Sequence, residues 1–467
     1  MPRSGGGARF RLGQEIAARR HRVDGRALIA LPDARDGRLA VIGEREWTLL
    51  RQADGTRDAE GVRVAAERAG ARVTREGIER FFAELAEAGL LAEDGDPRLE
   101  AGERAAAEPG GTDETDKELV PLPGYRLRCD GRGSCCRIYP TTLFSEPDAT
   151  RARALAPDVL DAGEDASRAF TPSRGSYAMA AESAGGDYGG LAVAMVDGAC
   201  AFWTPGGCRV HAAGGPRAKP AGCRLYPASF VDEGERVSVT VLPECACAFR
   251  SARTPGVGDV LTEVNSSSGL DTLVHVEQLP VFIAITEEVQ WPRARYLAWQ
   301  RGLAMNWSER VPGDGARTLL SLADSLLGSD PGPSSSGALP LEVELARELA
   351  ELVERARRRS VLHEPWRSAF DLARLVPRWL VAAGACVQRH GSGEPASEDE
   401  AFYVRAVAHG HLWIEDGRTL SCSLRRRAAR ILLARRLADA ARAEGFERVE
   451  PALEHPLALV EADARWL

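Results

Sequence analysis

The first part of the chain alternates between short apolar runs and polar turns. Residues Arg26 to Pro32 and Gly37 to Ile42 run apolar or alternate on either side of a turn-like stretch, which predicts a hairpin. Apolar residues then recur at helical spacing over Glu44 to Gln52, over Ala59 to Ala69 and from Thr74 onward. A hairpin and three short helices together predict a small winged-helix domain over residues 1 to 95.

Two polar stretches interrupt this pattern and predict linkers. Residues 96 to 120 hold prolines, glycines and many charges with almost nothing apolar, which is typical of a flexible linker. Residues 313 to 340 form the second expected linker because they end in a stretch rich in Ser, Pro and Gly. The residues between them, 121 to 312, form the expected middle unit of the chain.

Helical periodicity returns after the second linker. Apolar residues recur at helical intervals over Leu341 to Arg359, Ala369 to Val387 and Leu424 to Ala443, which predicts a helical C-terminal domain over residues 341 to 467. The expected fold class is therefore α+β with several domains: a winged-helix-like N-terminal domain, an irregular cysteine-rich domain and a helical C-terminal domain.

Composition and charge exclude some classes of function. A chain of 467 residues with 44% hydrophobic residues holds enough apolar surface for about three cores. The formal charge of -8 gives no basic field, so nucleic acid is not an expected partner. Of the 60 basic residues only Lys117 and Lys219 are lysines, so arginine richness is a bias of the whole chain. The run from Arg425 to Arg427 is accordingly expected to be a solvated helix face.

No stretch of the sequence predicts a membrane segment or a secretory signal. The first 20 residues contain no apolar core of a signal peptide, and no later stretch approaches the roughly 20 apolar residues of a membrane span. We therefore expect a cytoplasmic protein whose thiols are reduced and which does not contact a membrane.

Cysteine clustering is the strongest chemical signal in the chain. Eight of the ten cysteines fall within the middle unit: Cys129, Cys135, Cys136, Cys200, Cys208, Cys223, Cys245 and Cys247. Thiolates are soft ligands that favour zinc and iron–sulfur centres, so this density predicts a site for an iron–sulfur cluster or zinc. A disulfide framework is the weaker alternative, because it needs an oxidising compartment.

Local sequence suggests how the chain holds these thiols. Gly131 and Gly133 lie between Cys129 and the vicinal pair, where they permit a tight turn. Pro220 and Pro227 are expected to keep Cys223 on a rigid, non-helical stretch. An arginine follows a cysteine directly at three positions, where it either offsets thiolate charge or, as an equal alternative, is ordinary surface charge: Arg137, Arg209 and Arg224.

Eight sulfurs exceed the four ligands of one zinc ion or one four-iron cluster. The favoured ligands are Cys135, Cys136, Cys208 and Cys223, and the other four are nearly as strong candidates. The choice between one centre and two stays open. Histidines are weaker candidates, with His211 ahead of His275, His409 and His411. The two remaining cysteines, Cys386 and Cys422, are isolated in helical sequence and are expected to be small buried hydrophobes.

The middle unit resembles the YkgJ-type cysteine-cluster family, which is described as a zinc- or iron-chelating domain. The resemblance covers residues 120 to 255 and rests on the eight cysteines, the vicinal pair among them, and on the Pro220-x-x-Cys223-Arg224-x-x-Pro227 element. This chain departs from the family by the five residues between Cys129 and Cys135 and by a long insertion from about Leu143 to Val196.

A weaker resemblance links the chain to flagellin lysine N-methylases, through the cysteine cluster, the Pro243-Glu244-Cys245 ending and the helical C-terminal half. It implies transfer of a methyl group from S-adenosylmethionine to a protein lysine, but no catalytic residue can be carried over. No P-loop, dinucleotide fingerprint or nucleophile elbow is present. A metal-handling protein and a structural zinc scaffold are the non-enzymatic alternatives, so catalysis stays open.

The N-terminal unit resembles PqqD-type domains, which are small winged-helix modules that recognise peptides. The likeness runs from His21-Arg22-Val23-Asp24-Gly25 through Glu46-Trp47-Thr48-Leu49-Leu50 to Ala88-Gly89-Leu90-Leu91. It implies a peptide or protein partner that adds a strand to an exposed sheet edge. A packing domain without a peptide ligand is an equal alternative. DNA binding ranks third, because the segment carries 17 Arg against 16 Asp and Glu.

Overall fold

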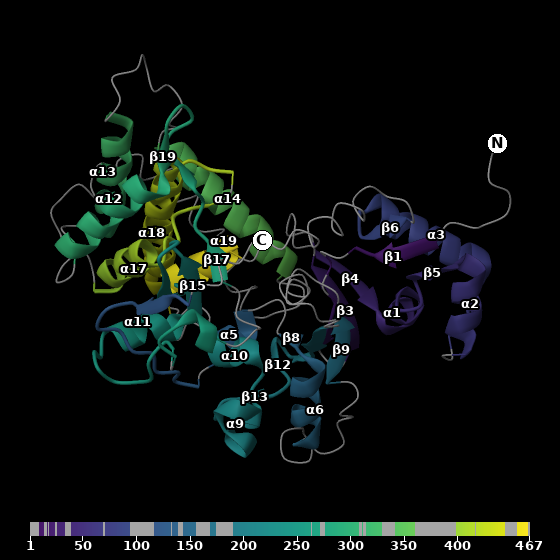
Figure 1. Cartoon of the computed structure of the whole chain (residues 1–467). Helices are drawn as coiled ribbons and strands as arrows, with labels where there is room; N and C mark the ends of the chain where they lie inside the picture. Colours follow the sequence, from purple (N-terminus) through teal and green to yellow (C-terminus); the bar gives the residue numbers. More distant parts are fainter. Residues whose placement is uncertain are drawn as a thin grey trace.

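The computed structural model shows a mixed α+β protein with several small sheets (Figure 1). It describes residues 9–13, 16, 18–23, 26–32, 39–68, 71–93, 116–131, 133–138, 143–155, 169–173, 190–262, 264–270, 276–307, 311, 314–328, 341–359, 398–415, 417–443 and 455–465. The general α+β expectation is thereby confirmed. Ala369–Val387, His275 and Cys386 lie outside the described residues.

The N-terminal segment contains the expected hairpin and helices. Its elements are β1 (Arg9–Leu12), β2 (Arg19–Val23), β3 (Arg26–Pro32), β4 (Leu39–Gly43), α1 (Glu44–Leu50), β5 (Asp54–Asp58), α2 (Ala59–Arg68), α3 (Arg75–Glu87) and β6 (Leu91–Glu93). Strands β3 and β4 pair antiparallel, with Ile29 opposite Ile42. Thr74 begins α3 as its N-cap, because its side-chain oxygen accepts a hydrogen bond from the Gly77 backbone at 3.1 Å.

A five-stranded sheet joins the N-terminal segment to the middle segment. Its order is β12-β11-β2-β3-β4, in which β11 (Met195–Val196) and β12 (Ala199–Cys200) come from the middle segment. Strand β11 runs parallel to β2, with Met195 opposite His21. One sheet therefore contains strands from both sides of the expected linker, and only β11 separates β2 from β12, the strand that carries Cys200.

The middle segment consists of short elements. They are β7 (Glu118–Pro121), α5 (Ser134–Ile138), β8 (Leu143–Phe144), α6 (Glu146–Ala154), β9 (Phe170–Ser173), β10 (Gly190–Val193), β11, β12, β13 (Trp203–Thr204), β14 (Gly207–Cys208), α9 (Arg209–Gly214), α10 (Ala221–Leu225), β15 (Ala228–Asp232), β16 (Arg236–Val241), α11 (Ala246–Ala252), β17 (Val276–Gln278), β18 (Phe282–Ala284), β19 (Gln290–Pro292) and α12 (Arg293–Asn306). Such short pieces need tertiary packing, because isolated helices of this length are unstable in water.

The end of the first expected linker is a strand instead. Residues Glu118–Pro121 form β7, which pairs parallel with β16 in the sheet β17-β15-β16-β7. Lys117 fixes the start of this strand through a buried ion pair, with its Nζ 2.8 Å from Asp232 Oδ2. The apolar residues Leu119 and Val120 form too short a run to predict a strand from sequence.

The helical C-terminal part begins earlier than expected. Its helices are α13 (Gly315–Gly328), α14 (Leu341–Arg359), α17 (Glu398–His409), α18 (Leu420–Ala443) and α19 (Pro456–Arg465). Helix α13 occupies much of the second expected linker and packs against α18. Its residues Leu319, Ala323 and Leu326 are buried at helical spacing. In the sequence analysis this segment was assigned to a linker because a stretch rich in Ser, Pro and Gly follows it.

One apolar core joins the middle and C-terminal segments. Phe249 of α11 packs edge-on against Phe402 of α17, with ring centroids 5.5 Å apart. Trp413 is fully buried in the same core. The helix that carries Cys247 is therefore part of the main hydrophobic core, and this anchors one side of the cysteine region.

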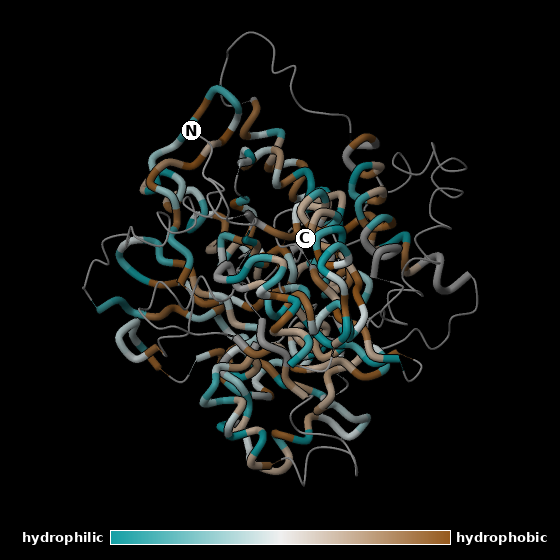
Figure 2. The backbone as a smooth tube through the Cα atoms, turned by 90° about the vertical axis from the view of Figure 1, so that its right-hand side faces the viewer, coloured by the Kyte–Doolittle hydropathy of each residue, from teal (hydrophilic) through white to brown (hydrophobic). Residues whose placement is uncertain are grey.

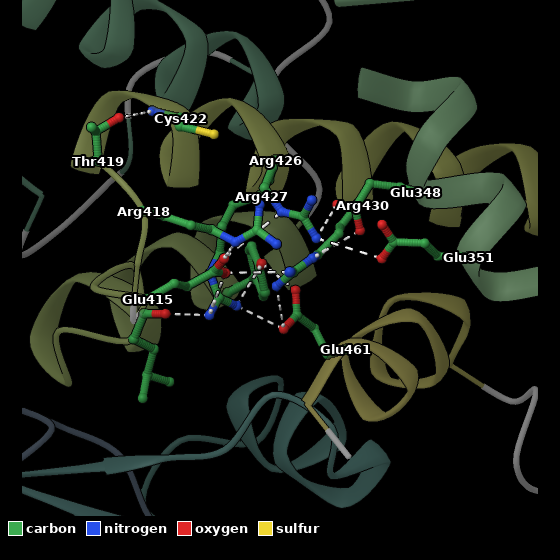
Figure 3. A network of polar contacts seen from close by, with 12 residues as sticks. Glu348, Glu351, Glu415, Arg418, Thr419, Cys422, Arg426, Arg427, Arg430 and Glu461 are labelled. Carbon is green, nitrogen blue, oxygen red and sulfur yellow. Dashed lines mark hydrogen bonds and ion pairs between the residues drawn. The ribbon is translucent and has the colours of Figure 1, made fainter. Parts of the chain in front are cut away.

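Two arginines of the run Arg425 to Arg427 are buried in α18, Arg426 and Arg427, which corrects the expectation of a solvated face. Arg426, Arg427 and Arg430 are each at most 7% exposed and pair with Glu348, Glu351, Glu415 and Glu461 (Figure 3). The Arg427 Nη1 atom lies 2.7 Å from Glu461 Oε2. Burying these guanidiniums is tolerated because each meets carboxylates from neighbouring elements.

No helix among the described residues is long and apolar enough to cross a membrane. Hydrophobic and hydrophilic stretches alternate along the backbone tube in Figure 2.

Candidate metal centre

Five of the eight cysteines form a first thiol group, defined as Cys135, Cys136, Cys200, Cys208 and Cys223. Cys135 and Cys136 lie on α5, Cys200 on β12, Cys208 at the end of β14 and Cys223 on α10. Helix α5 contacts β12. The members lie within electrostatic range of one another, and the Cys135 and Cys136 side chains are hydrogen-bonded.

Three cysteines form a second thiol group: Cys129, Cys245 and Cys247. The Cys247 side chain is hydrogen-bonded to both Cys129 and Cys245, and its Sγ donates to Asp130 Oδ1 at 3.3 Å. Arg250 pairs with Asp130 and lies 3.6 Å from Cys247 Sγ. Cys129 is exposed, whereas Cys245 and Cys247 are buried. Because Cys129 also interacts electrostatically with Cys135, the two groups adjoin.

The glycines of the loop before α5 allow a close approach to Trp203. Gly131 and Gly133 have φ angles of 75° and 80°, which confirms the expected tight turn. A side chain at Gly133 would come within 2.0 Å of Trp203 Nε1, and this same nitrogen donates a hydrogen bond to the Gly131 carbonyl at 3.1 Å. Trp203 thus holds the loop that joins the two thiol groups.

Cys223 lies on a short helix rather than on the expected non-helical stretch. Helix α10 spans Ala221–Leu225, and Pro220 serves as its N-cap in an extended conformation. Proline is well tolerated directly before or at the first turn of a helix, because no backbone hydrogen bond is lost there. The prolines therefore delimit the helix instead of excluding it.

Two cations that were not predicted also lie beside the thiols. Arg19 of β2 and Lys219 interact electrostatically with the first thiol group. Of the predicted cations, Arg137 stacks over the Trp203 ring at 4.4 Å, and Arg224 donates to the Lys219 carbonyl at 2.7 Å. Sequence reasoning missed Arg19 and Lys219, because neither adjoins a cysteine and Arg19 comes from another segment.

Burial keeps Cys200 and Cys223 protonated in the absence of metal. It raises the pKa of Cys200 to about 11 and moves the pKa of Cys223 further above its ordinary value. The hydrogen bond between the vicinal thiols lowers the pKa of Cys135 and raises that of Cys136. Any metal that binds here must displace protons, so uptake would weaken as pH falls.

The donor chemistry fits a thiophilic metal, although the adjacent thiols Cys135 and Cys136 are paired with each other. Within the described parts of the chain, no group of three or more His, Cys, Asp or Glu side chains stands in a metal-holding arrangement. Soft sulfur donors next to cations suit zinc or an iron–sulfur cluster. Coordination would require the paired side chains to rotate towards a common point.

The other histidine and cysteine residues considered in the sequence analysis belong to neither thiol group. His211 is exposed on α9, and Cys422 is half-buried rather than buried. His411 is buried and contacts Glu233 Oε1 and the Tyr296 hydroxyl, each at 3.0 Å. This polar network connects the β15–β16 turn, α12 and the residues after α17, and it was not predicted. Its buried carboxylate gave no local sequence signal.

His409 makes the stability of this region depend on pH. Burial lowers its pKa from 6.5 to about 4, with His411, Glu233 and Arg236 nearby, and its Nε2 hydrogen-bonds the Val120 carbonyl at 3.0 Å. The unfolded chain binds the proton more readily, so stability is full above about pH 6.5 and falls towards pH 4. We expect wild type to lose about 2 kcal/mol more than His409→Gln between pH 7 and pH 5 in urea unfolding. Identical pH dependence in both proteins would contradict this assignment.

Comparison of the chain with protein-family models, with curated proteins and with solved structures found no match. The resemblances to cysteine-cluster, lysine N-methylase and PqqD-type proteins therefore stay predictions.

Proposed function

We propose that this chain is a cysteine-cluster protein of the YkgJ type that binds an iron–sulfur cluster or zinc in a reducing, cytoplasmic setting. The observation that carries the proposal is the convergence of eight thiols from separate elements into two adjoining groups. An apolar interior has no need of so many polarizable sulfurs in one place, whereas a thiophilic metal does. The bound group would supply an electron-transfer centre if it is iron–sulfur and a rigid cross-link if it is zinc.

Residues of both thiol groups would bind the metal or cluster, and neighbouring residues would hold them in position. The first thiol group offers five sulfurs on short elements, of which α5 and β12 are in contact, so it is the better site for a first centre. The second thiol group would either complete that centre through Cys129 or hold a second one. Trp203 would keep the connecting loop in place, and the core around Phe249 would fix the Cys247 helix.

We further propose that the N-terminal segment is a winged-helix, PqqD-like interaction domain for a peptide or protein. Strand β2 is already paired on both sides, with β11 and β3. Among the described strands, β4 pairs only with β3, so an added strand would lie along β4. Val41 on this strand is 38% exposed, which supplies apolar surface for a partner.

Alkylation of thiols before and after metal removal tests the metal-binding proposal. We expect iodoacetamide to modify Cys422 equally with and without a chelator, since Cys422 lies outside both thiol groups. The cysteines of the first thiol group should react at least tenfold faster once the chelator has removed the metal, because ligated thiolates are shielded. Peptide mass spectrometry assigns each site. Equal labelling of Cys135, Cys136, Cys200, Cys208 and Cys223 in both states would overturn the proposal.

A further inference from the structure

Arg19 is a fully buried arginine of the N-terminal segment that lies beside the cysteine region. It lies on β2 and is only 1% exposed. Its Nε donates a hydrogen bond at 2.8 Å to the carbonyl of Val193 on β10, 174 residues further along the chain. A buried guanidinium is costly unless neighbouring groups compensate it, so its surroundings require an explanation.

The sheet register places Arg19 on the same face as Cys200. Met195 is paired with His21 on one side and with Cys200 on the other, so these three side chains project from one face. Arg19 is two residues before His21 and shares that face. Its guanidinium interacts electrostatically with Cys200, Cys136 and Cys223, all members of the first thiol group.

Charge balance explains why a cation is needed there. Four thiolates around Zn²⁺, or around a four-iron cluster in its oxidised state, leave a net charge of two negative units. Placing that charge in a buried site is unfavourable without positive neighbours. Arg19 and Lys219 both interact with the first thiol group, and together they supply two positive charges.

We propose that Arg19 is a charge-compensating positioning residue of the metal centre, so that the N-terminal segment forms part of that centre. This inference rests on the proposed metal-binding function. It changes the role of the N-terminal segment, because a partner bound there would act on a sheet that also carries Cys200 and Arg19. Removal of the N-terminal segment is therefore expected to weaken metal binding.

Variants at Arg19 separate charge compensation from simple packing. Arg19→Gln removes the charge, Arg19→Lys keeps it, and Arg20→Gln is the matched control. Arg20 is adjacent on β2, points to the other face of the sheet and pairs with Glu44 at 2.5 Å. The full-length protein is purified with its metal, and the rate of metal transfer to a chelator is measured together with metal content. Circular dichroism checks that each variant is folded.

We expect Arg19→Gln to lose metal at least tenfold faster than wild type, and Arg19→Lys and Arg20→Gln to stay within about threefold. Equal rates for Arg19→Gln and Arg20→Gln in a metal-loaded protein would overturn the inference alone. A tenfold effect of Arg19→Lys would also overturn it, because packing rather than charge would then matter. A wild-type protein without metal would overturn the proposed function and this inference with it.

Variants at Lys219 provide a second test of charge compensation if Arg19→Gln does not fold. Its side chain is only half-buried, so substitution is less disruptive to packing. Lys219→Gln should also speed metal loss, whereas Lys219→Arg should not. Equal behaviour of these two variants would count against charge compensation at this centre.

Discussion

Replacement of Cys135 and Cys136 together by serine is expected to remove the bound metal. These adjacent thiols lie on α5, are hydrogen-bonded to each other, and interact with Cys200 and Cys223. Serine hydroxyls are hard, weakly acidic ligands that do not replace thiolates on zinc or iron. The double variant should retain less than about a tenth of the wild-type metal per chain.

Metal analysis of the purified variant measures this effect, and Cys422→Ser serves as the control. Cys422 is half-buried on α18 and belongs to neither thiol group, so its replacement should leave the metal content unchanged. Circular dichroism establishes whether loss of metal also unfolds the chain. Full retention of metal by the double variant would exclude the vicinal pair as ligands.

Replacement of Arg427 by alanine is expected to destabilise the helical C-terminal part by about 3–5 kcal/mol. Arg427 Nη1 donates to Glu461 Oε2 at 2.7 Å and to the Tyr403 hydroxyl at 3.2 Å, in fully buried surroundings. Removing the guanidinium leaves the buried Glu461 carboxylate with less compensation. Its remaining cation, Arg430, is more distant, at 3.5 Å.

Urea unfolding followed by circular dichroism gives this difference in stability. Arg425→Ala is the matched control because Arg425 is two residues away on the same helix and pairs with Asp324, which is 65% exposed. A pair that is open to solvent contributes little, so the control should lose no more than about 1 kcal/mol. Equal losses in the two variants would show that the buried network in Figure 3 does not stabilise the fold.

The elements that could be predicted are those encoded by local sequence. The hairpin β3–β4, the helix after Thr74 and helix α14 follow from short-range periodicity and capping, and the structure contains them. Gly131 and Gly133 were predicted to allow a turn and do adopt positive φ angles. Each of these features depends on residues that are close together in the chain.

The features that could not be predicted depend on contacts between distant residues. Arg19 faces the thiols only because β2 pairs with β11, and no pattern around Arg19 indicates that pairing. The buried arginines of α18 look like a surface run until α14 and α19 bring Glu348 and Glu461 against them. Charge patterning along one helix cannot indicate which other helix will cover it.

Clustering of cysteines in sequence predicted a gathering of thiols but not its division into two groups. That division arises because Cys245 and Cys247 are held in the core around α11, whereas Cys200 and Cys208 pack against a separate apolar cluster that contains Phe170 and Phe202. Spacing along the chain carries no information on this choice. The number of metal centres therefore has to be determined by metal analysis of the protein.

Metal and acid-labile sulfide content of the 467-residue chain, purified without oxygen, decides whether the cysteine region binds a metal. We expect either iron with matching sulfide and visible absorption, or colourless protein with stoichiometric zinc. Protein that is folded, has all its thiols free and contains neither metal would contradict the claim that this cysteine region is a metal centre.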